Sequence, residues 1–149
     1  MNRLQKISNL GKLTEKKIKI CHYSKFYSKL RNKIHTTIRK HNNWKIGQIL
    51  IEKVNGKFIQ EVEVIAKKRG VLLDFTLKTL RMDTDEKSFI RICNLFNEMK
   101  RKIFNRYNNS NRTFKPYDFG SDIFTLYTLE VKKQTKIEDF LTIKESVLA

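Results

Sequence analysis

The chain has 149 residues, of which 40% are hydrophobic and 11% aromatic, and these values predict one domain with a modest core. Its 32 Lys and Arg residues outnumber its 15 Asp and Glu residues, which gives a formal net charge of +17. A compact protein of that charge repels itself, so an acidic partner is expected, with nucleic acid as the first candidate. No apolar run approaches the length of a transmembrane helix, and no basic amphipathic helix has a Trp- and Leu-rich face, so a membrane partner is not expected.

The cysteine and histidine residues do not form a metal-site pattern. Cys21 and Cys93 lie far apart, which favours two reduced thiols over a disulfide. The histidines share one basic stretch, at His22, His35 and His41. The neighbours Cys21 and His22 lack the second ligand pair of a zinc site, so neither a metal nor another cofactor is expected.

The first 43 residues are strongly basic and contain a single acid, Glu15. This composition is typical of a mitochondrial presequence and also of an RNA-binding tail, and the sequence leaves both open. Apolar side chains recur every four residues in this stretch, at Phe26, Leu30, Ile34 and Ile38. That spacing predicts a helix over about residues 23–40.

The stretch 46–66 predicts a β-hairpin. Asn55 and Gly56 both tolerate the positive φ of a type I′ turn, and β-branched residues dominate the flanking arms. A basic turn at residues 67–70 and a third strand at residues 71–80 are predicted to follow.

Strands are also predicted in the second half of the chain. An acidic turn is expected at residues 83–86, followed by a fourth strand near residues 89–92. Residues 95–104 fit a strand or a helix, and residues 105–113 are a polar loop by composition. Alternation of side chains over residues 123–131 predicts the last strand.

Five or six short strands joined by tight turns predict a mainly β fold, closed into a small barrel. The predicted organisation has three parts. Residues 1–43 are a basic N-terminal extension with a helix, residues 44–131 are the barrel domain, and residues 132–149 are a polar C-terminal tail.

The sequence carries no pattern typical of an enzyme. The P-loop, nucleophile-elbow and zinc-protease motifs are absent. Asp83, Asp85 and Glu86 cluster in an expected turn, where a solvated loop tip is favoured over a catalytic metal site. No catalytic residue is therefore predicted, and the expected role is binding rather than chemistry.

Basic side chains cluster at two places beyond the first 43 residues. The first cluster is Lys67, Lys68 and Arg69. The second is Lys100, Arg101, Lys102, Arg106, Arg112 and Lys115. Cationic side chains on a rigid scaffold neutralise phosphates and release counterions. For either cluster alone a solvated surface is favoured, but the charge of +17 over the whole chain favours RNA binding. Tyr107 and Tyr117 are candidates for stacking on bases, whereas Tyr127 is expected in the core.

Short segments between residues 44 and 130 occur in a familiar order. They are Trp44, Ile46–Gly47, Lys57, Ile59–Gln60, Glu63–Ala66, Lys67–Gly70, Asp74–Lys78, Glu86, Phe89, Asn94–Ile103 and Leu126–Leu129. Their order resembles that of bacterial-type large-subunit ribosomal protein nineteen. A glycine and a proline of the family pattern are missing, and the loop 105–122 is longer, which indicates a divergent mitochondrial member.

The resemblance implies a small SH3-like barrel with an N-terminal helix and basic tails. It implies a structural constituent of the mitochondrial large ribosomal subunit, acting in translation near the subunit interface. The implied partners are large-subunit ribosomal RNA, neighbouring ribosomal proteins and small-subunit RNA through an intersubunit bridge. The implied location is the mitochondrial matrix, with a bacterial cytoplasm or a plastid as alternatives.

The resemblance also assigns individual residues. Those placed on RNA are Lys57, Gln60, Lys67, Lys68, Arg69 and Lys78. The core candidates are Phe58, Val62, Val64, Phe75, Leu77, Phe89, Leu126 and Leu129.

Two other functions are left open. A helical interpretation of residues 44–82 would place a helix-turn-helix at residues 67–71, as in a DNA-binding plasmid or phage protein. A small nuclease would use the acids at residues 83–86 to hold a divalent metal.

Overall fold

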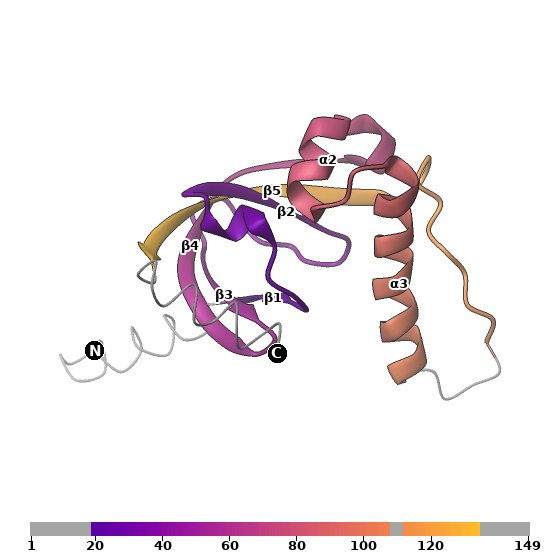
Figure 1. Cartoon of the computed structure of the whole chain (residues 1–149), viewed down its shortest axis with the longest axis horizontal. Coiled ribbons are helices and arrows are strands. Elements are labelled where there is room, and N and C mark those ends of the chain that lie inside the picture. The colour runs from indigo at the N-terminus through magenta and orange to yellow at the C-terminus, as the bar shows by residue number, and fades with distance from the viewer. Residues whose placement is uncertain (1–18, 108–111, 135–149) are drawn as a thin grey trace, which may run out of the picture.

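The structure, a computed structural model, describes residues 19–107 and 112–134 (Figure 1). In chain order its elements are β1 (Lys19–Tyr23), the 3-10 helix η1 (Ser28–Arg31), β2 (Ile34–Arg39), β3 (Ile49–Val54), β4 (Lys57–Val71), the 3-10 helix η2 (Leu72–Asp74), α2 (Leu77–Thr84), α3 (Phe89–Tyr107) and β5 (Ile123–Gln134). The predicted mainly β class agrees with these elements.

The five strands form one mixed sheet in the order β1-β3-β4-β5-β2. β1 pairs with β3 in parallel, and the other three pairs are antiparallel. β1 and β2 are close in sequence but lie at the two opposite edges of the sheet. No backbone ladder joins these edges in the described part of the chain, so the sheet is not closed into the barrel that the sequence predicted.

The predicted hairpin between β3 and β4 is confirmed. Asn55 has φ 52° and Gly56 has φ 81°, as a type I′ turn requires. The predicted turn at residues 67–70 is wrong, because β4 continues through it and stays paired with β5 as far as Val71 and Ile123. With residues 49–71 in strands, the helix-turn-helix interpretation of this region is also wrong.

The helix predicted over residues 23–40 is wrong as well. Leu30 lies in η1, and Ile34 and Ile38 lie in β2. The four-residue spacing is a coincidence of two short elements rather than one helical face. The pairing partner that makes β2 a strand is β5, where Ile34 meets Glu130, and a local pattern does not reveal a partner so distant in sequence.

Helices α2 and α3 replace the strands predicted at residues 71–80 and 89–92, and α3 also resolves residues 95–104 as helical. A side-chain cap begins each helix: the Thr76 hydroxyl accepts from the Thr79 amide at 3.1 Å, and the Ser88 hydroxyl accepts from the Arg91 amide at 3.2 Å. The last strand, predicted at residues 123–131, is confirmed as β5.

The buried apolar residues form two clusters. One lies within the curved sheet and includes Trp44, Leu50 and Tyr127, and the other lies under α2 and α3 and includes Leu80, Phe96 and Phe124. Of the core candidates, Val62, Val64, Phe75 and Leu129 are buried, Phe89 and Leu126 are partly buried, and Phe58 and Leu77 are exposed. No helix of the described segments is long and apolar enough to span a bilayer.

Candidate nucleic-acid interface

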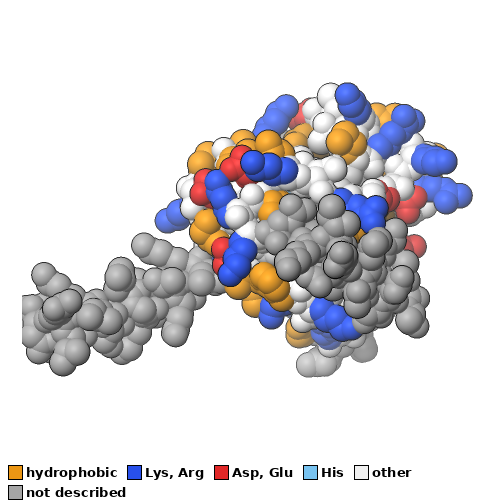
Figure 2. Space-filling model, turned by 60° about the vertical axis from the view of Figure 1, so that its left-hand side comes forward, with side chains coloured by type: hydrophobic (Ala, Val, Ile, Leu, Met, Phe, Trp, Pro, Cys, Tyr) orange, Lys and Arg blue, Asp and Glu red, His pale blue; other side chains and the backbone are white. Residues whose placement is uncertain are grey.

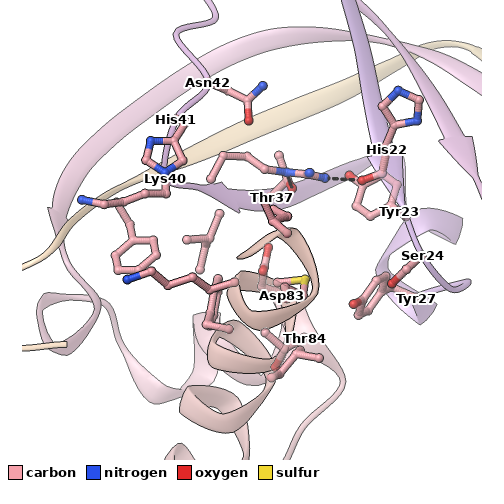
Figure 3. A pocket seen from close by; sticks show the side chains of 18 of the residues that line it. His22, Tyr23, Ser24, Tyr27, Thr37, Lys40, His41, Asn42, Asp83 and Thr84 are labelled. Atoms are coloured by element: carbon pink, nitrogen blue, oxygen red, sulfur yellow. Dashed lines mark hydrogen bonds between the residues drawn. The ribbon is translucent and has the colours of Figure 1, made fainter. Parts of the chain in front are cut away.

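A pocket of about 280 Å³ opens where the two sheet edges approach each other above the helices (Figure 3). We call it the seam pocket. Its walls come from five groups of residues. They are His22, Tyr23, Ser24, Tyr27 and Lys29 in β1, η1 and the segment between them; residues 37–42 at the end of β2; Asp83 and Thr84 of α2; Leu95, Phe96, Met99, Lys100 and Ile103 of α3; and Tyr117 and Phe124. The His22–Tyr27 side and the Lys40–Asn42 side face each other across the pocket in Figure 3. The site is therefore built from segments that are far apart in sequence.

Arg39 bridges the two edge strands. Its Nη2 donates to the carbonyl of His22 at 2.8 Å and contacts the Cys21 sulfur at 3.2 Å. Its guanidinium also lies over the ring of Tyr23, 5.1 Å from the centroid, and Nε donates to Thr37 Oγ1 at 3.0 Å. A side chain thus joins β1 to β2 where the backbone does not, and it presents a charge to the seam pocket.

Lys29 and Asp83 form a buried ion pair at the base of the pocket. Lys29 Nζ lies 2.9 Å from Asp83 Oδ1, and the two side chains are only 5% and 6% exposed. The hydroxyl of Thr36 donates to the same oxygen at 2.9 Å, and the Lys29 ammonium is 5.2 Å from the Tyr23 ring centroid. Because Asp83 is paired and buried, the predicted solvated acidic tip at residues 83–86 is wrong for this residue.

Glu52 of β3 holds Tyr23 from below the pocket. Its carboxylate is fully buried and accepts from the Tyr23 hydroxyl at 2.6 Å and from the Gln60 amide at 2.8 Å, and it lies 2.8 Å from Nε2 of His35. Burial opposes the charged carboxylate, but the His35 contact and the Tyr23 and Gln60 hydrogen bonds outweigh it and lower the pKa of Glu52. Burial raises the pKa of Tyr23 well above its ordinary value, so its hydroxyl stays a donor to Glu52.

Two further cations, Lys40 and Lys100, line the pocket. The Lys40 ammonium donates to the carbonyl of Ile123 at 2.9 Å, and the Lys100 ammonium lies 4.5 Å from the Tyr117 ring centroid. Asp83 is the acid in the lining and is already paired with Lys29. The pocket therefore combines aromatic walls with an excess of positive charge, which is the chemistry that recognises stacked bases and phosphates.

The structure scatters the residues that the ribosomal resemblance placed on RNA. Lys57 follows the hairpin turn, Lys67, Lys68 and Arg69 lie along β4, and Lys78 lies on α2, all exposed. Gln60 has no exposed surface and donates to Glu52 and to the carbonyl of Leu30, so RNA cannot reach its side chain.

Several residues of the second basic cluster, which was predicted from charge, lie close together in the structure. Lys100 lines the seam pocket, and Arg101 packs on Phe114 beside Arg112 and Lys115. Lys102 and Arg106 are exposed on α3. Of the tyrosines proposed for stacking, Tyr117 lines the pocket and Tyr107 is exposed, while Tyr127 is buried as expected.

Sequence reasoning missed Tyr23, Tyr27, Lys29 and Arg39. The signal was present as interleaved aromatic and cationic residues over residues 22–31, HYSKFYSKLR. Read as one helix, these residues point in all directions. In the strand–turn–strand arrangement that the structure shows, several of them meet in one pocket.

Comparison with solved structures finds a neighbour of similar fold. The crystal structure of an ASCH domain from Lactobacillus crispatus JV V101 matches with a TM-score of 0.51, over 76% of this chain and 79% of that chain. The fold is ASCH-like. Sequence identity is 11%, so the likeness concerns the fold alone. No family model matches the sequence, and no curated protein matches it.

The ASCH-like fold overturns the resemblance to ribosomal protein nineteen. That resemblance rested on short segments taken to be strands of a barrel. Asp74–Lys78 in fact spans the end of η2 and the start of α2, and Asn94–Ile103 lies within α3. The matching residues therefore lie in helical elements here rather than in barrel strands, and the family assignment is wrong.

Proposed function

We propose that the protein binds single-stranded RNA without performing chemistry on it, and that the seam pocket receives one nucleotide of the strand. The observation that carries this proposal is a pocket lined by aromatic side chains together with Arg39, Lys40 and Lys100, in which the one lining acid, Asp83, is already paired with Lys29. Unpaired bases can enter such a concave site, whereas the bases of a duplex remain stacked and out of reach.

The distribution of charge supports a polyanionic ligand. Lys and Arg side chains outnumber acidic ones on the face seen in Figure 2, where they are spread over the surface. Spread-out cations attract a phosphate backbone without reading its sequence. Specific recognition is then left to the pocket, where aromatic rings and hydrogen-bonding groups such as His22, His41 and Asn42 are available to a base.

The decisive experiment measures binding of fluorescein-labelled RNA by fluorescence anisotropy. Wild-type protein is compared with Arg39→Gln and with Lys133→Gln, which removes the same charge from an exposed site on β5 outside the pocket. We expect Arg39→Gln to weaken binding about tenfold, which corresponds to about 1.4 kcal/mol, and Lys133→Gln to have little effect. A single strand is expected to bind better than the duplex of the same sequence.

Arg39 also joins two strands, so the folding of the variant needs its own check. Circular dichroism of Arg39→Gln shows whether the sheet is retained, and Lys40→Gln tests the pocket mouth without touching the β1–β2 bridge. Folded variants that bind RNA as tightly as wild type would remove the seam pocket from the proposal. Absence of RNA binding by wild type at low salt would remove the proposal itself.

The proposed location is the mitochondrial matrix. Its support is the basic composition of residues 1–18, the part of the basic stretch that precedes β1, in which Glu15 is the one acid. Cell fractionation followed by protease protection tests it, and a protein found wholly outside the organelle would contradict it.

A further inference from the structure

A second cavity lies beside the C-terminal half of α3 and shares Lys100 with the seam pocket. Its volume is about 460 Å³, and Lys100, Phe104 and residues 112–115 line it. In Figure 1 the segment before β5 runs alongside α3 at one end of the sheet. We call this cavity the α3 groove. The function proposed above uses only the seam pocket and gives the α3 groove no role.

The α3 groove has the same chemistry as the seam pocket. The ring of Phe114 packs edge-on against Phe104, with centroids 5.6 Å apart, and carries the Arg101 guanidinium 4.2 Å from its centroid. Arg112 and Lys115 are exposed beside it. None of these cations takes part in an ion pair among residues 19–107 and 112–134. Their charge is therefore available to an anionic ligand.

Lys100 connects the two cavities. Its ammonium lies 4.5 Å from the ring centroid of Tyr117, which lines the seam pocket, and 5.9 Å from that of Phe114, which lines the α3 groove. A single cation thus stands at the border between two aromatic sites. A phosphate that links two successive nucleotides, with one base in each site, would meet this ammonium.

We infer that the α3 groove is a second nucleotide subsite, and that one RNA strand runs from the seam pocket across Lys100 into it. The inference rests on the function proposed above and deepens it. The ligand is then an oligonucleotide, because a free mononucleotide would fill one cavity and leave Arg112, Phe114 and Lys115 without a role.

The test is affinity as a function of RNA length. Single-stranded oligoribonucleotides from two to ten residues, together with a mononucleotide, are titrated against wild type and two double variants. The groove variant is Arg112→Gln with Lys115→Gln. The matched control is Lys45→Gln with Lys133→Gln, which removes the same two charges from exposed positions outside both cavities.

Wild-type affinity should rise steeply with length until both subsites are filled. The groove variant should lose about tenfold in affinity for the longer strands while keeping the wild-type affinity for the mononucleotide. Phe114→Leu should show the same loss of affinity for the longer strands. Phe114→Tyr should bind as tightly as wild type, because it keeps a ring for stacking. Retained circular dichroism confirms that each variant is folded.

Three outcomes would overturn the inference. If the groove variant matches the control at every length while Arg39→Gln still weakens binding, RNA uses the seam pocket alone and the proposed function survives. If polyglutamate displaces long RNA from wild type as well as RNA itself does, the α3 groove is a general anion site. If wild type binds no RNA, the proposed function fails and this inference fails with it.

Discussion

Tyr23 is the side chain on which the candidate site depends. Its hydroxyl is fixed by Glu52, and its ring carries Lys29 and Arg39, so one residue links the buried polar network to the pocket. Hydrogen bonds to ionised groups are stronger than those between neutral groups, and leaving a buried partner unsatisfied is costly. Glu52 therefore contributes to the site by orienting Tyr23 from below.

Replacing Glu52 should destabilise the protein and flatten its response to acid. Glu52→Gln should reduce the free energy of unfolding by about 1–3 kcal/mol, and Glu52→Ala by about 3–5 kcal/mol, because buried His35 and Tyr23 lose their partner. Urea unfolding followed by circular dichroism measures both.

The pH dependence follows from the lowered pKa of Glu52. In the unfolded chain the carboxyl takes up a proton near its ordinary value of 4.5, whereas in the folded protein it stays ionised to lower pH. Protons therefore favour the unfolded state, and the contribution of Glu52 is present above pH 4.5 and is lost as pH falls toward the folded-state pKa. The difference in stability between wild type and Glu52→Gln should shrink over that window. A constant difference from pH 7 to pH 3 would contradict this prediction.

The buried polar side chains of the site could not be predicted from the sequence, for a physical reason. Glu52, Gln60 and Asp83 are residue types that are normally exposed, and here all three are buried. Partners compensate the Glu52 and Asp83 carboxylates and the Gln60 amide nitrogen, whereas Gln60 Oε1 has no hydrogen-bond partner among the described residues. His35 and Lys29 supply these partners from elements that are distant in sequence. Composition could predict a basic protein, but it could not show which polar side chains are buried together.

Among the elements, those with a local signal were predicted and those that depend on distant pairing were not. The β3–β4 hairpin follows from Asn55 and Gly56, whose turn conformation needs no outside partner. β2 is a strand because β5 pairs with it, and the continuation of β4 past residue 67 has the same cause. The helix caps Thr76 and Ser88 were a local signal that β-branched and aromatic neighbours obscured.

The hairpin turn gives a prediction about conformational strain. Gly56 has φ 81°, and a Cβ added there would meet no atom within 4 Å, so Gly56→Ala should be destabilising through strain alone, by about 1 kcal/mol. Gly120→Ala is the matched control, because its Cβ would make ordinary contacts at 3.5 Å and its φ is not positive. Thermal melts of the two variants compare them. Equal melting temperatures would show that the turn is not strained by alanine.

The end of α2 gives a second prediction at this scale. Asp85 ends the helix with φ 61°, and its carboxylate accepts from both the amide and the hydroxyl of Ser28. Asp85→Ala should destabilise the protein by about 2 kcal/mol, because it removes these bonds and puts alanine in a left-handed conformation. Asp85→Asn, which tolerates that conformation, should lose less. If the two variants lose the same stability in urea, the backbone conformation of residue 85 has no energetic weight.

For the whole molecule, the net charge of +17 sets how binding responds to salt. Each phosphate that the protein neutralises releases counterions, so the logarithm of the RNA affinity should fall linearly with the logarithm of salt concentration, with a slope of roughly −0.7 for each phosphate contact. Lys100→Gln should make that slope shallower by about 0.7, the share of one phosphate contact. The Lys100 ammonium forms no ion pair in the described segments and lies between the two cavities. Anisotropy titrations between low and physiological salt measure it, and an affinity independent of salt would exclude a phosphate ligand.

The opposite placement of β1 and β2 in the sheet affects the order of events during synthesis. Ile34 needs Glu130 as its strand partner, so β2 can pair only after β5 has left the ribosome. The hydrogen bond from Arg39 to His22 and the contact between His35 and Glu52 form at the same late stage, because both require β2 to be in place. A nascent chain that stops short of β5 therefore has the positive charge of this protein but lacks the pocket. Under the proposed function, such a chain attracts nucleic acid through its charge alone, and recognition by the pocket begins only after β5 has been synthesised.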